Sequence, residues 1–500
     1  MNTQPSDLPA PAPEQAPLLS AHPPLWLALL AAAMAGGMGW GIRGQYGHET
    51  GAMIPGLLVG LVLVFLFCPR ATSLQAARAV ALTAVAFSFG GSMTYGQTVG
   101  LTHDAPLLGN TQAFWWGMLG LFIKGGIWIG FAGAFLGIGL SERQYRTWEI
   151  LVLSFALIAL MIAGIYVLNE PFDPANHRLP RIYFSDHWRW EPDQPDLQPR
   201  RECWGGLLFA LAGLTAYLAV IKRDLLGRNL ALFGFLFGGL GFTLGQSIQA
   251  YRVRHEPFLS FDRYINWWNM MEITFGLVLG FGLALGLWLN RDRVGPLDQD
   301  AEPCLTPGNE WALIAIHAAA LAAWSFVEFP VLDRIADHGL TMGVIPLLGI
   351  AGGRLWPYFL CLPLLALPIA GKTLRQMSYY TTQTPVLEGW VYYVILPLAF
   401  MLLAAWFFYR RGRRGQSGRA FTRLVLLLAT WFYFAINFAF FEFPWPWATT
   451  TGRTPSAIIF LVCSAVLTLT ALLYGWGFRP RIPPQRRDPS QPPAAAAESV

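Results

Sequence analysis

Residues 113–140 read AFWWGMLGLFIKGGIWIGFAGAFLGIGL, an apolar run interrupted by one charge, Lys124. A helix needs about 20 apolar residues to cross the roughly 30 Å hydrocarbon core of a membrane, so this run is long enough to span one. Comparable runs occur at 25–42, 52–68, 76–97, 148–168, 204–221, 229–247, 264–289, 310–327, 388–409, 420–441 and 455–477. The sequence therefore predicts an all-α fold, a polytopic integral membrane helical bundle.

The composition supports this prediction. Of the 500 residues, 54% are hydrophobic and 13% are charged, whereas about a quarter of a soluble chain is charged. The mean hydropathy is +0.43. These values exclude an ordinary soluble domain, and we expect membrane lipids and a small-molecule or lipid-linked solute as partners, with no nucleic acid. The oligomeric state stays open.

The helix count depends on residues 339–371, which either cross twice, turning at Gly352-Gly353-Arg354, or form a re-entrant pair. Arginine and lysine favour cytoplasmic loops. Alternate loops carry Arg70 and Arg78; Arg143 and Arg146; Lys222, Arg223 and Arg228; Arg291 and Arg293; and Arg410, Arg411, Arg413, Arg414 and Arg419. We therefore place both termini in the cytoplasm, which requires an even number of crossings, 12 or 14. The composition suggests a bacterial inner membrane.

Five segments are predicted along the chain. Pro- and Ala-rich tails at 1–23 and 479–500 are expected to be disordered, the second of them basic. Between them lie a membrane half at 24–290 with an outer loop at 169–203, a cytoplasmic linker at 291–309 and a second membrane half at 310–478. The five cysteines form no C-x-x-C motif, and no cofactor or metal is expected.

One short motif occurs three times, each time after a glycine-rich apolar run. The copies are Gly44-Gln45 with His48-Glu49, Gly96-Gln97 with His103-Asp104, and Gly245-Gln246 with His255-Glu256. Trp115-Trp116 and Trp267-Trp268 follow the second and third copies and open long apolar runs. We interpret these segments as repeated helical hairpins with their polar motifs on the outer face. The competing interpretation is that close helix packing alone selects the glycines.

The paired histidines and acids suggest chemistry, because imidazole titrates near neutrality and an adjoining carboxylate tunes its pKa or tautomer. Three pairs on one face suit a proton relay, a general base or a metal site. Metal binding is disfavoured, since adjacent loop residues seldom both reach one ion. The alternative is that each histidine is simply solvated at the membrane surface.

Arginines and aromatic residues near these motifs predict recognition of an anionic or sugar-like solute, because guanidinium groups bind phosphate or carboxylate in bidentate fashion. The predicted binding residues are Arg43, Gln45, Gln97, His103, Asp104, Gln246, Arg252, Trp267 and Trp268. Ordinary interfacial tryptophans would account for part of this set.

Three ionisable residues lie within apolar runs, at depths of roughly 12–16 Å by helical rise. They are Lys124, Glu272 and His317. Charges at such depth normally face protein or a wet cavity and pair with one another. We expect Lys124 and Glu272 to form an intramembrane ion pair or to carry coupling protons.

Two functions fit these features. The first is a secondary, proton-coupled transporter for a small anionic or sugar-like solute, since repeats, broken helices and buried charges are typical of transporters. The alternative is a membrane transferase with an outer-leaflet active site for a lipid-phosphate-linked sugar or acyl donor, in which His48, Glu49, His255 and Glu256 would be catalytic. The sequence contains no P-loop, G-x-S-x-G or H-E-x-x-H motif, which argues against nucleotide-driven transport and the familiar hydrolases. Whether the protein is an enzyme stays open.

Overall fold

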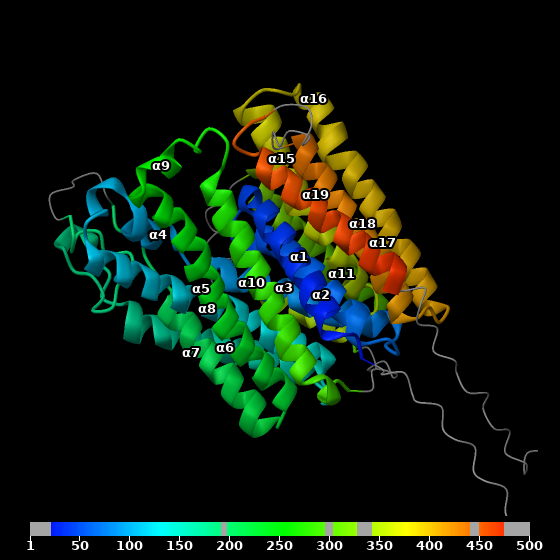
Figure 1. Ribbon diagram of the computed structural model, residues 1–500. Helices are drawn as coiled ribbons and strands as arrows, with labels where there is room; N and C mark the ends of the chain where they lie inside the picture. Colours follow the sequence, from blue (N-terminus) through cyan, green and yellow to red (C-terminus); the bar gives the residue numbers. More distant parts are fainter. Residues whose placement is uncertain (1–21, 192–197, 296–303, 328–342, 441–449, 475–500) are drawn as a thin grey trace, which may run out of the picture.

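The computed structural model describes residues 22–191, 198–295, 304–327, 343–440 and 450–474. In these ranges the chain is helical, without β-strands (Figure 1). Twelve helices are long and apolar enough to cross a membrane, and the shorter apolar helix α3 (Ser73–Phe89) accompanies them. The predicted all-α polytopic bundle is therefore confirmed. Residues 1–21 of the first tail, residues 296–303 of the predicted linker and the whole of the second tail fall outside the described residues, so the expected disorder of the tails stays a prediction.

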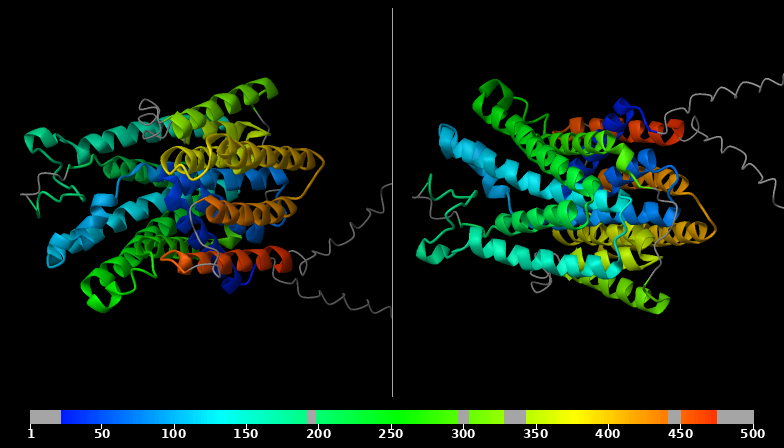
Figure 2. Two further views of the ribbon diagram at one scale, coloured as in Figure 1. Left: turned by 90° about the horizontal axis from the view of Figure 1, so that it is seen from above. Right: turned by 90° about the horizontal axis from the view of Figure 1, so that it is seen from below.

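The first half contains ten α-helices. They are α1 (Leu25–Arg43), α2 (Glu49–Phe67), α3, α4 (Gly96–His103), α5 (Thr111–Leu140), α6 (Thr147–Gly164), α7 (Trp204–Ala216), α8 (Leu225–Arg254), α9 (Glu256–Leu259) and α10 (Trp267–Leu289). The second half contains α11 (Pro307–Ala322), α13 (Ile345–Gly352), α14 (Trp356–Phe359), α15 (Leu365–Leu374), α16 (Val386–Gly389), α17 (Leu396–Arg413), α18 (Gly418–Phe440) and α19 (Thr454–Leu469). The long helices lie roughly parallel, so their connections gather at the two ends of the bundle (Figure 2).

Side-chain caps fix where several helices begin. Asn110 accepts a hydrogen bond from the Ala113 amide at the start of α5, and Asn266 caps α10 in the same way. Asp224 caps α8. Such caps satisfy amides that have no partner inside the helix. They place the starts of α5 and α10 just before the two tryptophan pairs found in the sequence.

Glycines bring several pairs of helices into backbone contact, among them α1 with α10, α5 with α8, and α8 with α10. A Cβ atom on Gly276 of α10 would overlap the carbonyl oxygen of Gly36 on α1. A Cβ atom on Gly238 of α8 would overlap the carbonyl oxygen of Gly125 on α5. Small residues permit this close approach in membrane bundles, where van der Waals packing drives association. The helix pairs α1 with α10 and α5 with α8 are thus tightly packed.

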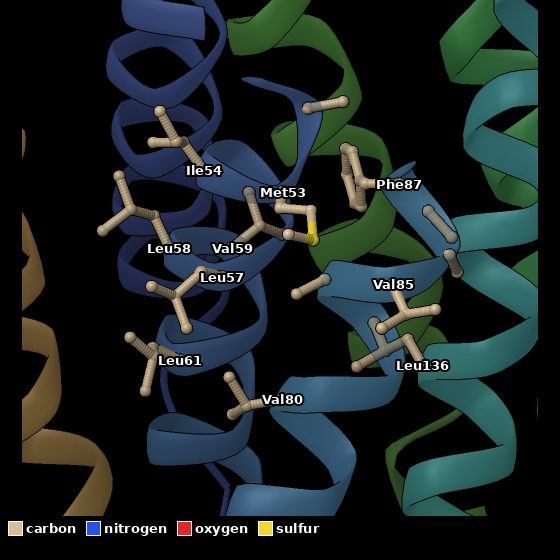
Figure 3. Packing of buried hydrophobic residues seen from close by; sticks show 14 of the residues in the cluster. Met53, Ile54, Leu57, Leu58, Val59, Leu61, Val80, Val85, Phe87 and Leu136 are labelled. Atoms are coloured by element: carbon tan, nitrogen blue, oxygen red, sulfur yellow. The ribbon is translucent and has the colours of Figure 1, made fainter. Parts of the chain in front are cut away.

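Helix α2 lies at the centre of the bundle. All its residues from Thr50 to Phe67 are buried, and it contacts α1, α3 and α18. Figure 3 shows Met53 of α2 on the side of Phe87 of α3, and Leu61 of α2 at about the level of Val80 of α3. A helix that is apolar on every side is expected in such a position.

The ambiguous segment 339–371 turns where the sequence suggested. Helix α13 ends at Gly352 and α14 begins at Trp356. Glu310 holds this turn, because its Oε1 accepts the Leu355 and Trp356 amides, both at 2.7 Å. The segment before Gly343 lies outside the described residues, but the membrane span after the turn continues to Tyr380, beyond the predicted end at 371.

Candidate functional site

A turn between two membrane helices and a break in a third helix face each other at one end of the bundle. Helix α1 ends at Arg43, and the 3₁₀ turn Gly44–Tyr46 leads into the next membrane helix, α2. Helix α3 ends at Phe89, and the 3₁₀ turn Gly90–Ser92 precedes α4. The predicted single crossing at 76–97 is therefore wrong, because the helix breaks at Gly90. The α1–α2 turn and the α3–α4 break touch so closely that a Cβ atom on Gly91 would overlap the His48 carbonyl.

A lysine from another helix donates to a backbone carbonyl oxygen in the α1–α2 turn and in the α3–α4 break. Lys124 of α5 donates from Nζ to the carbonyl oxygen of Thr94 at 2.7 Å. Lys372 of α15 donates to the carbonyl oxygen of Tyr46 at 2.7 Å and to Thr50 Oγ1 at 2.8 Å. Irregular backbone at membrane depth needs such partners, because no water replaces the lost helical hydrogen bonds.

Arg43 is the centre of a buried polar group that we call the arginine cluster: Arg43, His48, Tyr95 and Glu272. Its guanidinium donates to the Tyr95 hydroxyl at 2.7 Å, to Glu272 Oε1 at 3.2 Å and to His48 Nδ1 at 3.1 Å. The Arg43 and Glu272 side chains are only 2% and 3% exposed. The Trp40 ring lies 4.7 Å from the guanidinium carbon and adds a cation–π contact.

Glu272 is held by its own helix as well as by Arg43. Trp268 donates from Nε1 to Glu272 Oε1 at 3.3 Å, and the side-chain Nδ2 of Asn269 is 3.5 Å from Oε2. The same Nδ2 donates to the Gly41 carbonyl of α1 at 2.8 Å. The carboxylate is therefore fixed against the end of α1, which a buried charge requires.

His48 lies at the open side of the cluster. Its ring is exposed, yet it packs edge-on against Tyr95 with centroids 4.7 Å apart. Burial against the surrounding protein, which disfavours the charged imidazolium, and the positive charges of Arg43, Lys372 and Arg200 lower the pKa of His48 to about 3. His48 is therefore neutral at pH 7. Since Arg43 can only donate, Nδ1 is the acceptor and the imidazole proton is on Nε2.

The predicted ion pair between Lys124 and Glu272 is wrong. Lys124 pairs instead with Glu202, which also accepts hydrogen bonds from Ser185 Oγ at 2.7 Å and the Phe184 amide at 3.1 Å. The described part of loop 169–203 packs on α5, where Trp116 donates to the Tyr183 carbonyl. This loop supplies Glu202 to Lys124, while Glu272 pairs with Arg43. The two pairs meet at the α3–α4 break, because Thr94 binds Lys124 and its neighbour Tyr95 binds Arg43.

Several predicted binding residues hold the fold together instead of lining this site. Gln97 binds the backbone of Gln198 and Arg200, and the buried Gln246 donates to Thr102 Oγ1. Arg252 and Trp267 both bind Asp262 in the loop before α10. Of the predicted residues, Arg43, His48, Trp268 and Glu272 come together, and Glu49 in the first turn of α2 is close enough to interact electrostatically with Arg43. The side chain of Gln45 lies outside what the structure describes.

The other two histidine–acid pairs have separate surroundings. His103 Nδ1 bonds the Val99 carbonyl, while Asp104 contacts His187 at 3.4 Å. The hydrogen bond from His187 lowers the pKa of Asp104, and the nearby charge of His103 acts in the same direction.

At the end of α8, His255 stacks on Tyr251 with centroids 3.8 Å apart, and both His255 and Glu256 are exposed. His317 stacks on Trp356 of α14. The part of the chain that the structure describes contains no group of three His, Cys, Asp or Glu residues placed to hold a metal ion.

Sequence reasoning missed Tyr95, Glu202 and Lys372. Lys372 carried the same signal as Lys124, a lone charge in an apolar run, but the predicted span stopped one residue before it. Tyr95 and Glu202 carried no comparable local signal, because only long-range packing brings them to Arg43 and Lys124.

The sequence matches no protein-family model, and comparisons with curated proteins and with solved structures find no similar protein.

Proposed function

We propose that this polytopic protein is a proton-coupled secondary transporter for a small anionic solute, and that the arginine cluster recognises the solute. The turn between α1 and α2 and the break between α3 and α4 meet there around a buried ion pair. A discontinuous helix beside buried charges is a common element of transporter binding sites.

The observation that carries this proposal is the electrostatic environment of His48. Burial is the largest cause of its lowered pKa, and three cations, Arg43, Lys372 and Arg200, lower the pKa further. A positive potential that repels a proton from the imidazole attracts an anion to the same place. The Nε2–H group of the neutral ring supplies a further donor. The open side of the cluster thus suits a phosphate or carboxylate group.

Coupling follows from competition for Arg43. Glu272 holds the guanidinium at 3.2 Å in the structure. When Glu272 takes up a proton, its charge is lost and Arg43 becomes free to bind the anionic solute instead. Solute and proton then enter together, and release of the solute restores the ion pair. His48, neutral at pH 7, orients Arg43 in this scheme and does not take up the coupling proton.

The alternative of an outer-leaflet transferase requires a general base. His48 does not suit that role, because its Nδ1 accepts from Arg43 and its Nε2 bears the proton. His255 bonds the Tyr251 carbonyl through Nδ1, so Glu256 does not orient it through that atom. These contacts favour transport over transfer.

The test is solute-driven proton movement in sealed liposomes that contain the purified protein and an internal pH-sensitive dye. Inorganic phosphate and small mono- and dicarboxylates form the panel. We expect Glu272→Gln to abolish proton movement and Arg43→Gln to abolish solute uptake, whereas Arg252→Gln, at an arginine paired outside the cluster, retains both. Silence across the panel from folded protein, or uptake unchanged in Arg43→Gln, would refute the proposal.

A further inference from the structure

A basic groove lies at the end of α17, at the opposite end of the bundle from the arginine cluster. It is a hollow of about 670 Å³. Arg410, Arg411 and Arg414 line it together with Trp406 and Phe407. The groove is close to the start of α3, because Ser417 bridges to Thr72 there.

The arginines of this groove lie at the C-terminal end of α17, where Arg410 and Arg411 are in the last turn and Arg414 caps the helix. Residues three or four positions apart lie on one side of an α-helix. Arg410 lies over the Trp406 ring at 5.2 Å, and Arg411 lies over the Phe407 ring at 5.3 Å. The residues that line the groove include no Asp or Glu. Three positive charges thus converge on a hollow whose lining contains no carboxylate to balance them.

Gln416 adds a second polar requirement in the same groove. Both polar atoms of its side-chain amide are enclosed, and neither has a hydrogen-bond partner among the described residues. Its backbone is fixed, since its amide donates to the Arg411 carbonyl at 3.1 Å and its carbonyl accepts from the Ser73 amide at 3.3 Å. Buried amides are normally satisfied, so a donor and acceptor here indicate a polar ligand.

The groove also has an apolar side along α17. Leu403 is 69% exposed and Phe407 is 48% exposed, and the same helix exposes Phe400 and Leu402. In a membrane-spanning bundle such side chains face lipid tails. A ligand in this groove therefore contacts arginines at one end and the membrane interior at the other. A water-soluble anion would contact the arginines but not the exposed apolar side chains of α17.

We propose that the groove binds the phosphate headgroup of an anionic phospholipid whose acyl chains lie along Leu403 and Phe407. The arginines bind the phosphate, and the Gln416 amide bonds the polar headgroup atoms. Basic pockets at the membrane surface beside transmembrane helices are suited to anionic headgroups. This inference does not depend on the proposed transport function.

The experiment measures binding of phosphatidylglycerol and phosphatidylcholine to the purified full chain in detergent by native mass spectrometry. We expect retention of phosphatidylglycerol and little of phosphatidylcholine. Arg410→Gln and Arg414→Gln should each weaken phosphatidylglycerol binding about fivefold, the effect of one interfacial charge. Arg413→Gln is the matched control, because Arg413 lies over Tyr409 and does not line the groove.

Three results would overturn the inference. The first is equal weakening in Arg413→Gln, which would show general charge attraction. The second is competition by water-soluble glycerophosphoglycerol as strong as by the intact lipid, which would remove the acyl chains from the site. The third is unchanged binding in Arg410→Gln and Arg414→Gln proteins whose thermal unfolding matches that of the unmodified protein.

Discussion

Substituting only one member of the Arg43–Glu272 ion pair should destabilise the protein strongly, because the buried charge that remains loses its partner. Glu272→Gln leaves the Arg43 guanidinium, 2% exposed, without a counter-charge. Removing one partner of a buried pair costs about 3–5 kcal/mol. Arg43→Gln should fall near the lower value, because Trp268 and Asn269 still donate to the remaining carboxylate.

The double variant tests this reasoning directly. With both charges gone no buried charge is left uncompensated, so the cost of the double variant should fall below the sum of the single costs by about 1–3 kcal/mol. The assay is reversible unfolding in mixed micelles with increasing SDS, followed by tryptophan fluorescence. The control cycle uses Arg252 and Asp262, whose side chains are 23% and 37% exposed and should couple by less than about 1 kcal/mol. Additive single costs at Arg43 and Glu272 would refute the reasoning.

Three further predictions concern the helix breaks. Because the folded-state pKa of His48 lies below its usual 6.5, the unfolded chain binds more protons between pH 6.5 and about 3; stability should decline as the pH falls through this window, and thermal unfolding of His48→Gln should show a shallower decline than that of the control His255→Gln. Gly91→Ala should lower stability by about 1–3 kcal/mol, because its Cβ would overlap the His48 carbonyl, whereas Gly96→Ala, with no neighbouring atom within 4 Å, should unfold like the unmodified protein. Lys372→Met should cost about 1–3 kcal/mol in the same denaturation assay, because the Tyr46 carbonyl loses this donor, and a change below 0.5 kcal/mol would contradict that role.

The sequence was sufficient to predict the class of fold and part of the site. Apolar runs predict membrane helices because length and hydropathy act locally, and Arg43 and Glu272 stood out as charges at or inside such runs. The partners of these charges were not predictable in the same way. The break at Gly90–Ser92 reads as one more glycine-rich stretch of helix, and nothing local separates it from the unbroken Gly238–Gly245 of α8. Glu202 pairs with Lys124 across 78 positions, a contact that depends on how loop 169–203 folds.

The glycine contacts between helices limit how this molecule can move. Arg43 and Glu272 belong to α1 and α10, whose backbones touch at Gly36 and Gly276. Helix α10 also touches α8, because a Cβ atom on Gly245 would overlap the Met271 carbonyl oxygen, and α8 touches α5 at Gly238. The charges of Arg43, Glu272 and Lys124 are therefore carried by one continuous row of close-packed helices. Thr94 and Tyr95 bond to the two ends of this row, so a shift of α5 relative to α1 must strain a contact on one of two adjacent residues.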